Sequence, residues 1–306
     1  MPVSPVPILR GVIASLLLAL NTLLWCLPLF ALALVKLALP FESVRRRIDP
    51  LLNAIAVCWV TGNDVWMRWT QRTQWDIEAP SGVDLQGWYL VSCNHQSWAD
   101  IFVLQRLLNR RIPLMKFFLK YELIYVPIMG LAWWALDFPF MRRYSDRYLR
   151  RHPEKRLQDL ETTRRACAKF ARYPTSVMNF VEGARFTPAK HEAQRSPYRH
   201  LLKPKAIALA LTLNSLGERF DSLIDVTIVY PEGIPGFWQF LCGDIGRIVV
   251  RAQRRPIPSA FFHTDAMSDS RARKQVQAWL HGIWTEKDQQ IDDLLARSGG
   301  AAGIRA

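Results

Sequence analysis

The chain has 306 residues, half of them hydrophobic, and carries a formal net charge of +14 at pH 7. This length leaves room for one substantial core and an appendage. An apolar yet basic composition favours a protein that lies against anionic membrane lipid, because lysine and arginine are attracted to acidic head groups. Nucleic acid also attracts basic chains, but no nucleic-acid-binding motif accompanies this charge, so we exclude it as a partner.

The first predicted element is a membrane helix. Gly11 to Val35 form a run of 25 residues without a charged side chain, and about 20 apolar residues can cross the hydrocarbon core of a bilayer. A signal peptide is the weaker interpretation, since the run is long and no clear cleavage site follows it. Lys36 and the arginines at 45–47 follow the run, against Arg10 before it. This bias predicts a cell (inner) membrane protein with the part of the chain after the run on the cytoplasmic face.

A second apolar run, Leu51 to Val60, is too short to predict a membrane span. It continues through Trp66 and Trp69 with charged residues between them. This pattern is typical of an interfacial helix, or of a helix that returns as a hairpin. We therefore assign residues 1–80 to N-terminal membrane-anchoring helices.

Beyond residue 80, strand-like runs alternate with amphipathic helices. Strands are expected at 88–93, 111–115, 177–181 and 226–230, and helices at 98–108, 162–170 and 205–216. This alternation predicts an α/β domain over residues 81–298, with a central, mostly parallel sheet flanked by helices. The tail at 299–306 is rich in glycine and alanine and is predicted to be disordered.

The turn after the first predicted strand carries a histidine and a carboxylate, His95 and Asp100. On one continuous helix these positions would point about 140° apart. They can meet only if His95 lies on the turn and Asp100 lies in the first turn of the next helix. A carboxylate on one ring nitrogen stabilises imidazolium, so the other nitrogen can act as a general base toward a hydroxyl. The alternative is that the two residues merely cap a helix.

Three further blocks follow in a fixed order. The four blocks together are Asn94-His95 with Asp100, Lys120 to Arg143, Glu182-Gly183-Ala184-Arg185, and Val226 to Pro231. They resemble the glycerolipid acyltransferases of the 1-acylglycerol-3-phosphate (lysophosphatidate) acyltransferase family, whose blocks are Asn-His-x4-Asp, a segment ending in arginine, Glu-Gly-Thr/Ser-Arg, and an apolar strand ending in proline. The match covers about residues 85 to 235, with a weaker one at 279–288.

The resemblance implies an O-acyltransferase that moves an acyl chain from a thioester to the sn-2 hydroxyl of a lysophospholipid. The simplest acceptor is 1-acylglycerol-3-phosphate, which gives phosphatidate, and the co-substrate is acyl-CoA or acyl carrier protein. No cofactor is implied. His95 would be the base, oriented by Asp100. The resemblance also implies the substrate-binding residues. Arg185, with Arg143 or Arg142, would bind the phosphate, and Glu182 would accept a hydrogen bond from the glycerol or from a neighbouring arginine. Gly183 would let the backbone approach the ligand, Pro231 would shape the acyl pocket, and Asn94 and Lys120 are further candidates.

Departures from the family pattern are few. Ala184 replaces a hydroxyl residue of the third block, and Asp137 stands where many relatives carry glycine. Two adjacent arginines, Arg142 and Arg143, occupy the place of one, and the spacing from Gly130 favours Arg143. The basic stretch at 142–156 is either a solvated helical face or a docking surface for phosphate groups.

Other chemistries are poorly supported. The five cysteines show no Cys-x-x-Cys pairing, which is typical of a reducing compartment, and the six histidines show no metal-ligand spacing. There is no Gly-x-Ser-x-Gly motif for a serine nucleophile. Two alternatives remain: an acyltransferase that remodels another lysophospholipid, and a non-enzymatic, membrane-anchored protein that binds anionic lipid.

Overall fold

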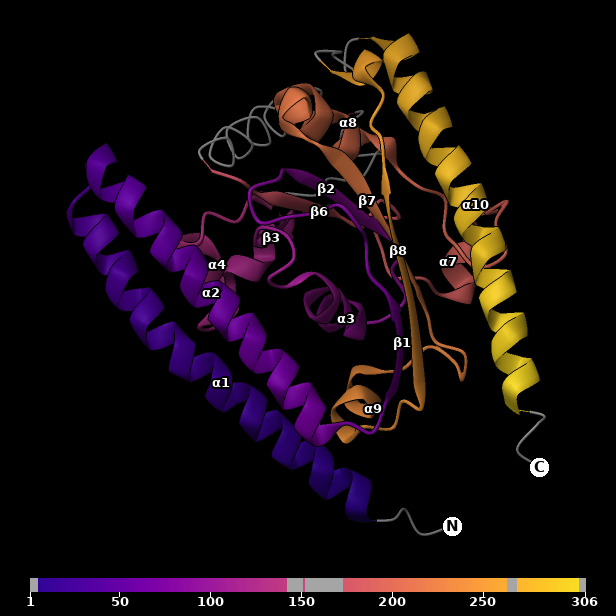
Figure 1. Ribbon diagram of the computed structural model, residues 1–306, viewed down its shortest axis with the longest axis horizontal. Helices are drawn as coiled ribbons and strands as arrows, with labels where there is room; N and C mark the ends of the chain where they lie inside the picture. The colour runs from indigo at the N-terminus through magenta and orange to yellow at the C-terminus, as the bar shows by residue number, and fades with distance from the viewer. Residues whose placement is uncertain (1–4, 142–150, 152–172, 263–268, 303–306) are drawn as a thin grey trace.

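The computed structural model describes residues 5–141, 151, 173–262 and 269–302 (Figure 1). It begins with two long helices, α1 (Pro5–Ala38) and α2 (Glu42–Thr70), which lie side by side as a hairpin. Helix α1 continues through Pro28 and is long and apolar enough to cross a membrane. Of the two arrangements expected for residues 51–69, the return hairpin is the one found.

Three amide side chains, two of them buried, join this hairpin to the rest of the molecule. Asn21 of α1 donates to Asn63 of α2 over 2.9 Å, and Asn63 donates to Gln105 of α3 (Ala99–Leu108) over 3.1 Å. Gly62 allows the close approach, because a Cβ there would lie only 2.1 Å from the Asn21 side chain. A satisfied buried polar network of this kind fixes one packing register between helices.

The centre of the fold is a six-stranded sheet of order β1-β8-β7-β2-β6-β3. Its strands are β1 (Gln74–Glu78), β2 (Tyr89–Cys93), β3 (Met115–Phe117), β6 (Ser176–Asn179), β7 (Ser222–Val229) and β8 (Arg247–Arg255). Strands β3, β6, β2 and β7 are parallel, while β8 runs antiparallel to β7 and parallel to β1. The mostly parallel sheet expected from the alternating pattern is confirmed.

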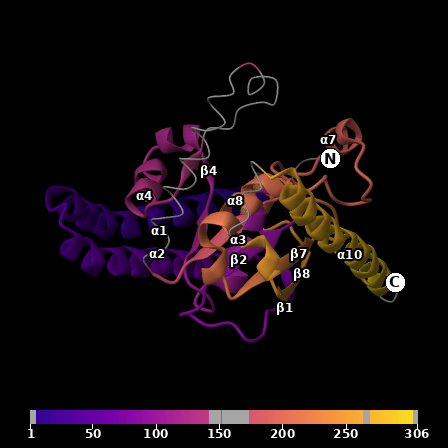
Figure 2. The ribbon, with the colours of Figure 1, turned by 90° about the horizontal axis from the view of Figure 1, so that it is seen from above.

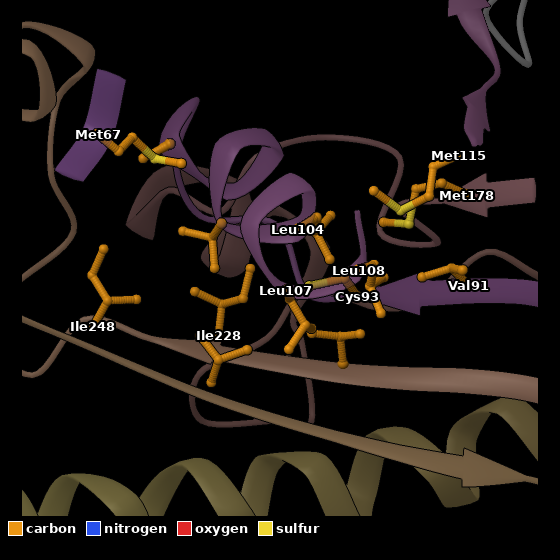
Figure 3. Packing of buried hydrophobic residues seen from close by; sticks show 14 of the residues in the cluster. Met67, Val91, Cys93, Leu104, Leu107, Leu108, Met115, Met178, Ile228 and Ile248 are labelled. Carbon is orange, nitrogen blue, oxygen red and sulfur yellow. The ribbon is translucent and has the colours of Figure 1, made fainter. Parts of the chain in front are cut away.

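Helices cover both faces of this sheet, as buried parallel strands require. Helices α8 (Ala206–Leu216) and α10 (Ser270–Ala302) pack on one face, and α3 and α9 (Phe237–Cys242) pack on the other. Figure 3 shows the second face, where Leu104, Leu107 and Leu108 of α3 meet Cys93 and Ile228 of the strands. The α1–α2 hairpin lies beyond α3 (Figure 1), so the layers are helices, sheet, helices and hairpin.

A smaller unit follows β3. It comprises a two-stranded sheet of β4 (Leu119–Lys120) and β5 (Phe140–Met141), the short helix η1 (Tyr121–Tyr125) and helix α4 (Met129–Ala135). Figure 2 shows α4 beside the hairpin, and Asp137 after α4 accepts a 2.7 Å hydrogen bond from Lys36 of α1. Asp137 has a φ of 58°, a left-handed conformation that favours glycine.

Several boundaries differ from the sequence prediction. Strand β1 belongs to the main sheet, so the sheet domain begins near residue 74 and the predicted boundary at residue 80 lies beyond this strand. Helix α10 includes residues 299–302, the start of the segment predicted to be disordered. The strand expected at 111–115 begins at Met115 instead, and the helix expected at 162–170 lies outside the described residues.

Candidate active site

The candidate site lies at one edge of the sheet, where three strands end. His95 follows β2, Glu182 follows β6 and Tyr230 follows β7. Because β2 is parallel to both neighbours, the carboxyl ends of all three strands meet at that edge. This edge is where open α/β sheets bind ligands.

His95 and Asp100 meet there in the predicted way. Asp100 lies in the first turn of α3, and its Oδ2 is 2.9 Å from Nδ1 of His95. The same oxygen accepts hydrogen bonds from the backbone N–H groups of Gln96 and Ser97, at 2.7 and 2.9 Å. Asp100 is fully buried, whereas His95 keeps part of its ring accessible. Nδ1 is therefore held by the carboxylate, which leaves Nε2 to take a proton.

Tyr230 completes this pair, and sequence reasoning missed it. Its phenol donates a 2.6 Å hydrogen bond to Oδ1 of Asp100, so both oxygens of the carboxylate are engaged. Burial raises the pKa of Tyr230 well above its usual value, and the nearby Asp100 charge adds to the shift, so the phenol remains a donor. Little in the sequence indicated this role, since Tyr230 ends an apolar run and is followed by Pro231.

Both carboxylate oxygens of Glu182 accept hydrogen bonds from backbone N–H groups, whereas Glu182 was expected to accept one from the glycerol or a neighbouring arginine. Its Oε1 accepts from the N–H of His95 and its Oε2 accepts from the N–H of Leu202, both at 2.9 Å. The side chain is buried, and burial raises the pKa of Glu182 to about 8 against the opposing effect of these two donors. Glu182 therefore joins the catalytic turn to the loop before α8.

Asn94 also acts on backbone. Its Nδ2 donates to the carbonyl of Ile228 over 2.8 Å, and its Oδ1 accepts from the N–H of the same residue over 2.9 Å. The amide thus extends the β2–β7 ladder by one pair where the β2 strand has ended. Asn94 was expected to bind substrate, but both its polar atoms are used to fix the turn that carries His95.

Arg185 lies at the rim of the site. Its guanidinium carbon is 4.6 Å from the centre of the Trp98 ring, and Trp98 is about half exposed at 48%. Gly183 has a φ of 71°, and a Cβ on it would lie 3.5 Å from Cδ of Lys205, whose side chain therefore covers this turn. Two cationic side chains, Arg185 and Lys205, are thus gathered beside the turn at 182–185, where they could bind an anionic group.

Four further residues were predicted to bind substrate, and the structure describes two of them, Lys120 and Pro231. Lys120 is exposed at the end of β4, in the two-stranded sheet. Pro231 follows Tyr230 and is half-buried. Arg142 and Arg143 lie outside the described residues, directly after β5.

A cavity of about 220 Å³ has His95 in its wall and is otherwise lined almost entirely by apolar side chains. The ring of Phe180 stacks on His95 with centroids 3.9 Å apart and forms one wall. Cys26 and Leu29 of α1 and Ala132 and Trp133 of α4 form walls farther away. An apolar cavity with one polar reactive group suits a ligand with a hydrocarbon chain and a single reacting end.

Among the described residues, no three His, Cys, Asp or Glu side chains lie close enough together to hold a metal ion. The cysteines described there, Cys26, Cys58, Cys93 and Cys242, are free thiols. The arrangement instead suits proton transfer: an imidazole fixed by a carboxylate, beside an apolar chain-sized cavity and a cationic rim.

Comparisons with known proteins point to one family. A family model described as Acyltransferase matches residues 75–233. The 1-acyl-sn-glycerol-3-phosphate acyltransferase delta of Homo sapiens is 27% identical over 213 residues, which are 65% of this chain and 51% of that protein. The gamma protein of Mus musculus is 24% identical over 180 residues, 55% of this chain and 43% of that protein. The chain therefore spans about half the length of the curated relatives it matches.

One solved structure has a similar fold over nearly the whole chain. It is the 1-acyl-sn-glycerophosphate (LPA) acyltransferase PlsC from Thermotoga maritima, with a TM-score of 0.51 and 13% sequence identity. The superposition covers 94% of this chain and 97% of that one. At this identity the likeness shows the fold alone.

Proposed function

The chain belongs to the acyltransferase family, and on this premise we propose that it transfers a fatty acyl chain from a thioester to the sn-2 hydroxyl of a lysophospholipid. The observation that carries the proposal is the His95–Asp100 pair at 2.9 Å, set in the wall of an apolar cavity. A protein that only binds lipid needs the arginines and the apolar surface. It does not need a histidine held by a buried carboxylate.

The proposed reaction needs one base and no covalent intermediate on the protein. Nε2 of His95 takes the proton of the acceptor hydroxyl while that oxygen attacks the thioester carbonyl carbon, which gives a tetrahedral oxyanion. Asp100 stabilises the imidazolium that forms. The oxyanion then collapses, the carbon–sulfur bond breaks, and the leaving thiolate takes the proton back from the imidazolium. The products are the ester and the free thiol, and His95 returns to its neutral form.

We assign the cavity to the acyl chain. Its apolar lining is the medium that a hydrocarbon chain prefers, and with His95 in its wall the carbonyl carbon of a bound chain can lie next to the base. The thioester carrier, acyl-CoA or acyl carrier protein, would remain on the aqueous side because its phosphates cannot enter hydrocarbon.

The acceptor phosphate would be held by Arg185 with Arg143, or with Arg142 in its place. A guanidinium fork binds two phosphate oxygens at once, which an ammonium group cannot do. Arg185 is already oriented by its stack on Trp98 at the rim. Lys205 beside Gly183 and Lys120 are secondary partners for phosphate on either substrate. This arrangement favours 1-acylglycerol-3-phosphate as acceptor.

The protein would be bound to the cytoplasmic face of the cell membrane through α1. This helix has 34 residues, or roughly 50 Å at 1.5 Å per residue. It contacts the sheet domain near its start, where Arg10 donates to the carbonyl of Cys242, and the α4 unit near its end, where Lys36 meets Asp137. These contacts lie near opposite ends of α1, so a helix that crossed the bilayer would place parts of one folded protein on both sides of it. We therefore place α1 along one leaflet, rather than across the bilayer as its apolar run suggested. A C-terminal reporter that reads out in the periplasm or lumen would contradict the cytoplasmic orientation.

The second candidate function keeps the chemistry and changes the acceptor to a lysophospholipid with a larger head group, because the Arg185–Trp98 pair lies at the surface, with Trp98 48% exposed. The deciding experiment is an assay of the purified protein with a panel of lyso-acceptors against acyl-CoA and acyl carrier protein donors. Transfer to 1-acylglycerol-3-phosphate above all others supports the proposal. Preference for another head group supports the second candidate, and no transfer with any pair contradicts both.

A further inference from the structure

A short exposed apolar segment lies beside the active site and has no part in the chemistry above. It consists of residues 234–238, where Ile234, Phe237 and Trp238 are 44%, 38% and 49% exposed. The segment is fixed rather than loose, because Gly236 caps α9 and its N–H donates to the side chain of Gln239 over 2.7 Å. Three large, solvent-exposed apolar side chains within five consecutive residues indicate a surface that contacts another molecule or a membrane.

This segment is continuous with the exposed surface of α1. The backbone of Gly11 lies against Trp238, since a Cβ on Gly11 would be 3.0 Å from that indole and 2.7 Å from Sγ of Cys242. Ile8 is one turn before Gly11 on the same side of α1 and is 47% exposed. The apolar surface of the candidate membrane helix therefore runs directly onto residues 234–238.

The segment is also joined to the turn that carries the catalytic pair. The hydroxyl of Ser97 donates to the carbonyl of Pro235 over 2.7 Å. The ring of Phe237 stacks on Phe102 of α3 with centroids 6.2 Å apart. Ser97 also donates its N–H to Asp100, so one residue contacts both the segment and the carboxylate that orients His95.

We propose that residues 234–238 are a second membrane-contacting element, which inserts Ile234, Phe237 and Trp238 at the head-group boundary of an anionic bilayer and presents lipid-borne acceptor to His95. A bilayer is favoured over a protein partner because the surface continues that of α1. In addition, Arg185 stacks on the ring of Trp98, and Trp238 lies against Gly11, the residue after Arg10. Indole rings and cations both suit the depth where lipid phosphates lie. This inference rests on the proposed function in taking the acceptor to be a lipid.

The test compares Ile234→Asp and Trp238→Gln with Leu85→Asp. Leu85 is 51% exposed on the loop before β2, at the opposite end of that strand from His95, so it is a matched surface control. Each full-length variant is assayed with palmitoyl-CoA and 1-acylglycerol-3-phosphate, either in phosphatidylglycerol–phosphatidylcholine vesicles or dispersed in detergent micelles. We expect an increase of about tenfold in the apparent acceptor KM on vesicles for Ile234→Asp, and rates within about twofold of wild type in detergent. Leu85→Asp should match wild type in both.

Two results would overturn the inference: equal losses in vesicles and micelles, or vesicle kinetics of Ile234→Asp that match wild type. Flotation of the same proteins with substrate-free vesicles separates this inference from the proposed function. If the wild type transfers no acyl group, weaker flotation of Ile234→Asp and Trp238→Gln than of Leu85→Asp still supports membrane contact by the segment. Equal flotation of all three variants contradicts it.

Discussion

The phenol of Tyr230 and the carboxylate of Asp100, 130 positions apart in the chain, are joined by a 2.6 Å hydrogen bond. Asp100 thereby receives a donor on each oxygen: Tyr230 on Oδ1, and His95 with two backbone N–H groups on Oδ2. We interpret Tyr230 as a positioning residue, because it acts on the substrate only through Asp100 and His95.

Tyr230→Phe should lower kcat by about tenfold, because a hydrogen bond to a charged group contributes about 1.5–3 kcal/mol. The loss of the donor leaves more charge on the carboxylate facing the imidazole. The acidic limb of the pH profile of kcat/KM should therefore move to higher pH. Tyr198→Phe is the control, since that phenol pairs with His281 away from the site. An unchanged pH profile in Tyr230→Phe would mean that the phenol has only a structural role.

His95→Ala should reduce the initial rate by about 10²- to 10⁴-fold, the range that general-base catalysis typically supplies. Asp100→Asn should lose at least about 10²-fold, because the amide cannot hold Nδ1–H and accept from Gln96 and Ser97 in the same way. Rates are measured in detergent at saturating donor, with membrane sedimentation as the check on folding and attachment. Turnover near wild type in His95→Ala would refute the catalytic assignment.

Arg185→Lys should mainly raise the acceptor KM, since the charge remains while the two-oxygen grip on phosphate is lost. Arg143→Lys should behave alike. Arg195→Lys, an exposed arginine at the end of α7 (Pro188–Gln194), should leave both KM values unchanged. An effect of Arg185→Lys on the thioester KM alone would move this residue out of the acceptor site and into the donor site.

Glu182 should make folding stability fall as the pH rises. Its pKa is about 8 in the folded protein against 4.5 as the reference, so the folded state binds this proton more tightly than the unfolded state. The contribution is complete below about pH 4.5 and is lost as the pH rises through 8, with a slope of at most about 1.4 kcal/mol per pH unit. Thermal unfolding between pH 5 and 8 measures it, with Glu182→Gln as the non-titrating reference. Parallel pH dependences in the two proteins would contradict the assignment.

Ala132→Leu should shift the donor preference toward shorter acyl chains, because Ala132 is buried in the cavity wall and a larger side chain reduces the volume there. The measurement is the ratio of kcat/KM for palmitoyl-CoA to that for octanoyl-CoA. Ala135→Leu, on the same helix but outside this wall, controls for the strain of adding volume to α4. Equal ratios in the two variants would mean that the acyl chain lies elsewhere.

The local features of this protein could be predicted from its sequence. An apolar run of about five residues, a polar turn and a periodic helix follow one another in the sequence, and they predict a strand, a turn and a helix. His95 and Asp100 lie on that turn and at the start of that helix, so their contact could be predicted from this one local segment. The alternation of such units predicted the mostly parallel sheet. Strand β8 was missed because its apolar run of three residues, Ile248 to Val250, is short and the nine residues of the strand include four arginines. Arg251 and Arg255 form ion pairs with acids on β1, β7 and α10.

Only the tertiary structure decided which side chains support the catalytic pair. Asn94 is hydrogen-bonded to the backbone of Ile228, and Tyr230 donates a hydrogen bond to Asp100. Glu182 accepts hydrogen bonds from the backbone of both His95 and Leu202. The cavity arises where α1 and α4, about a hundred residues apart in sequence, pack against the sheet domain. These contacts depend on strand order, on register and on the desolvation of buried polar groups. Such quantities are set by the packing of distant segments, and no local window of residues contains them.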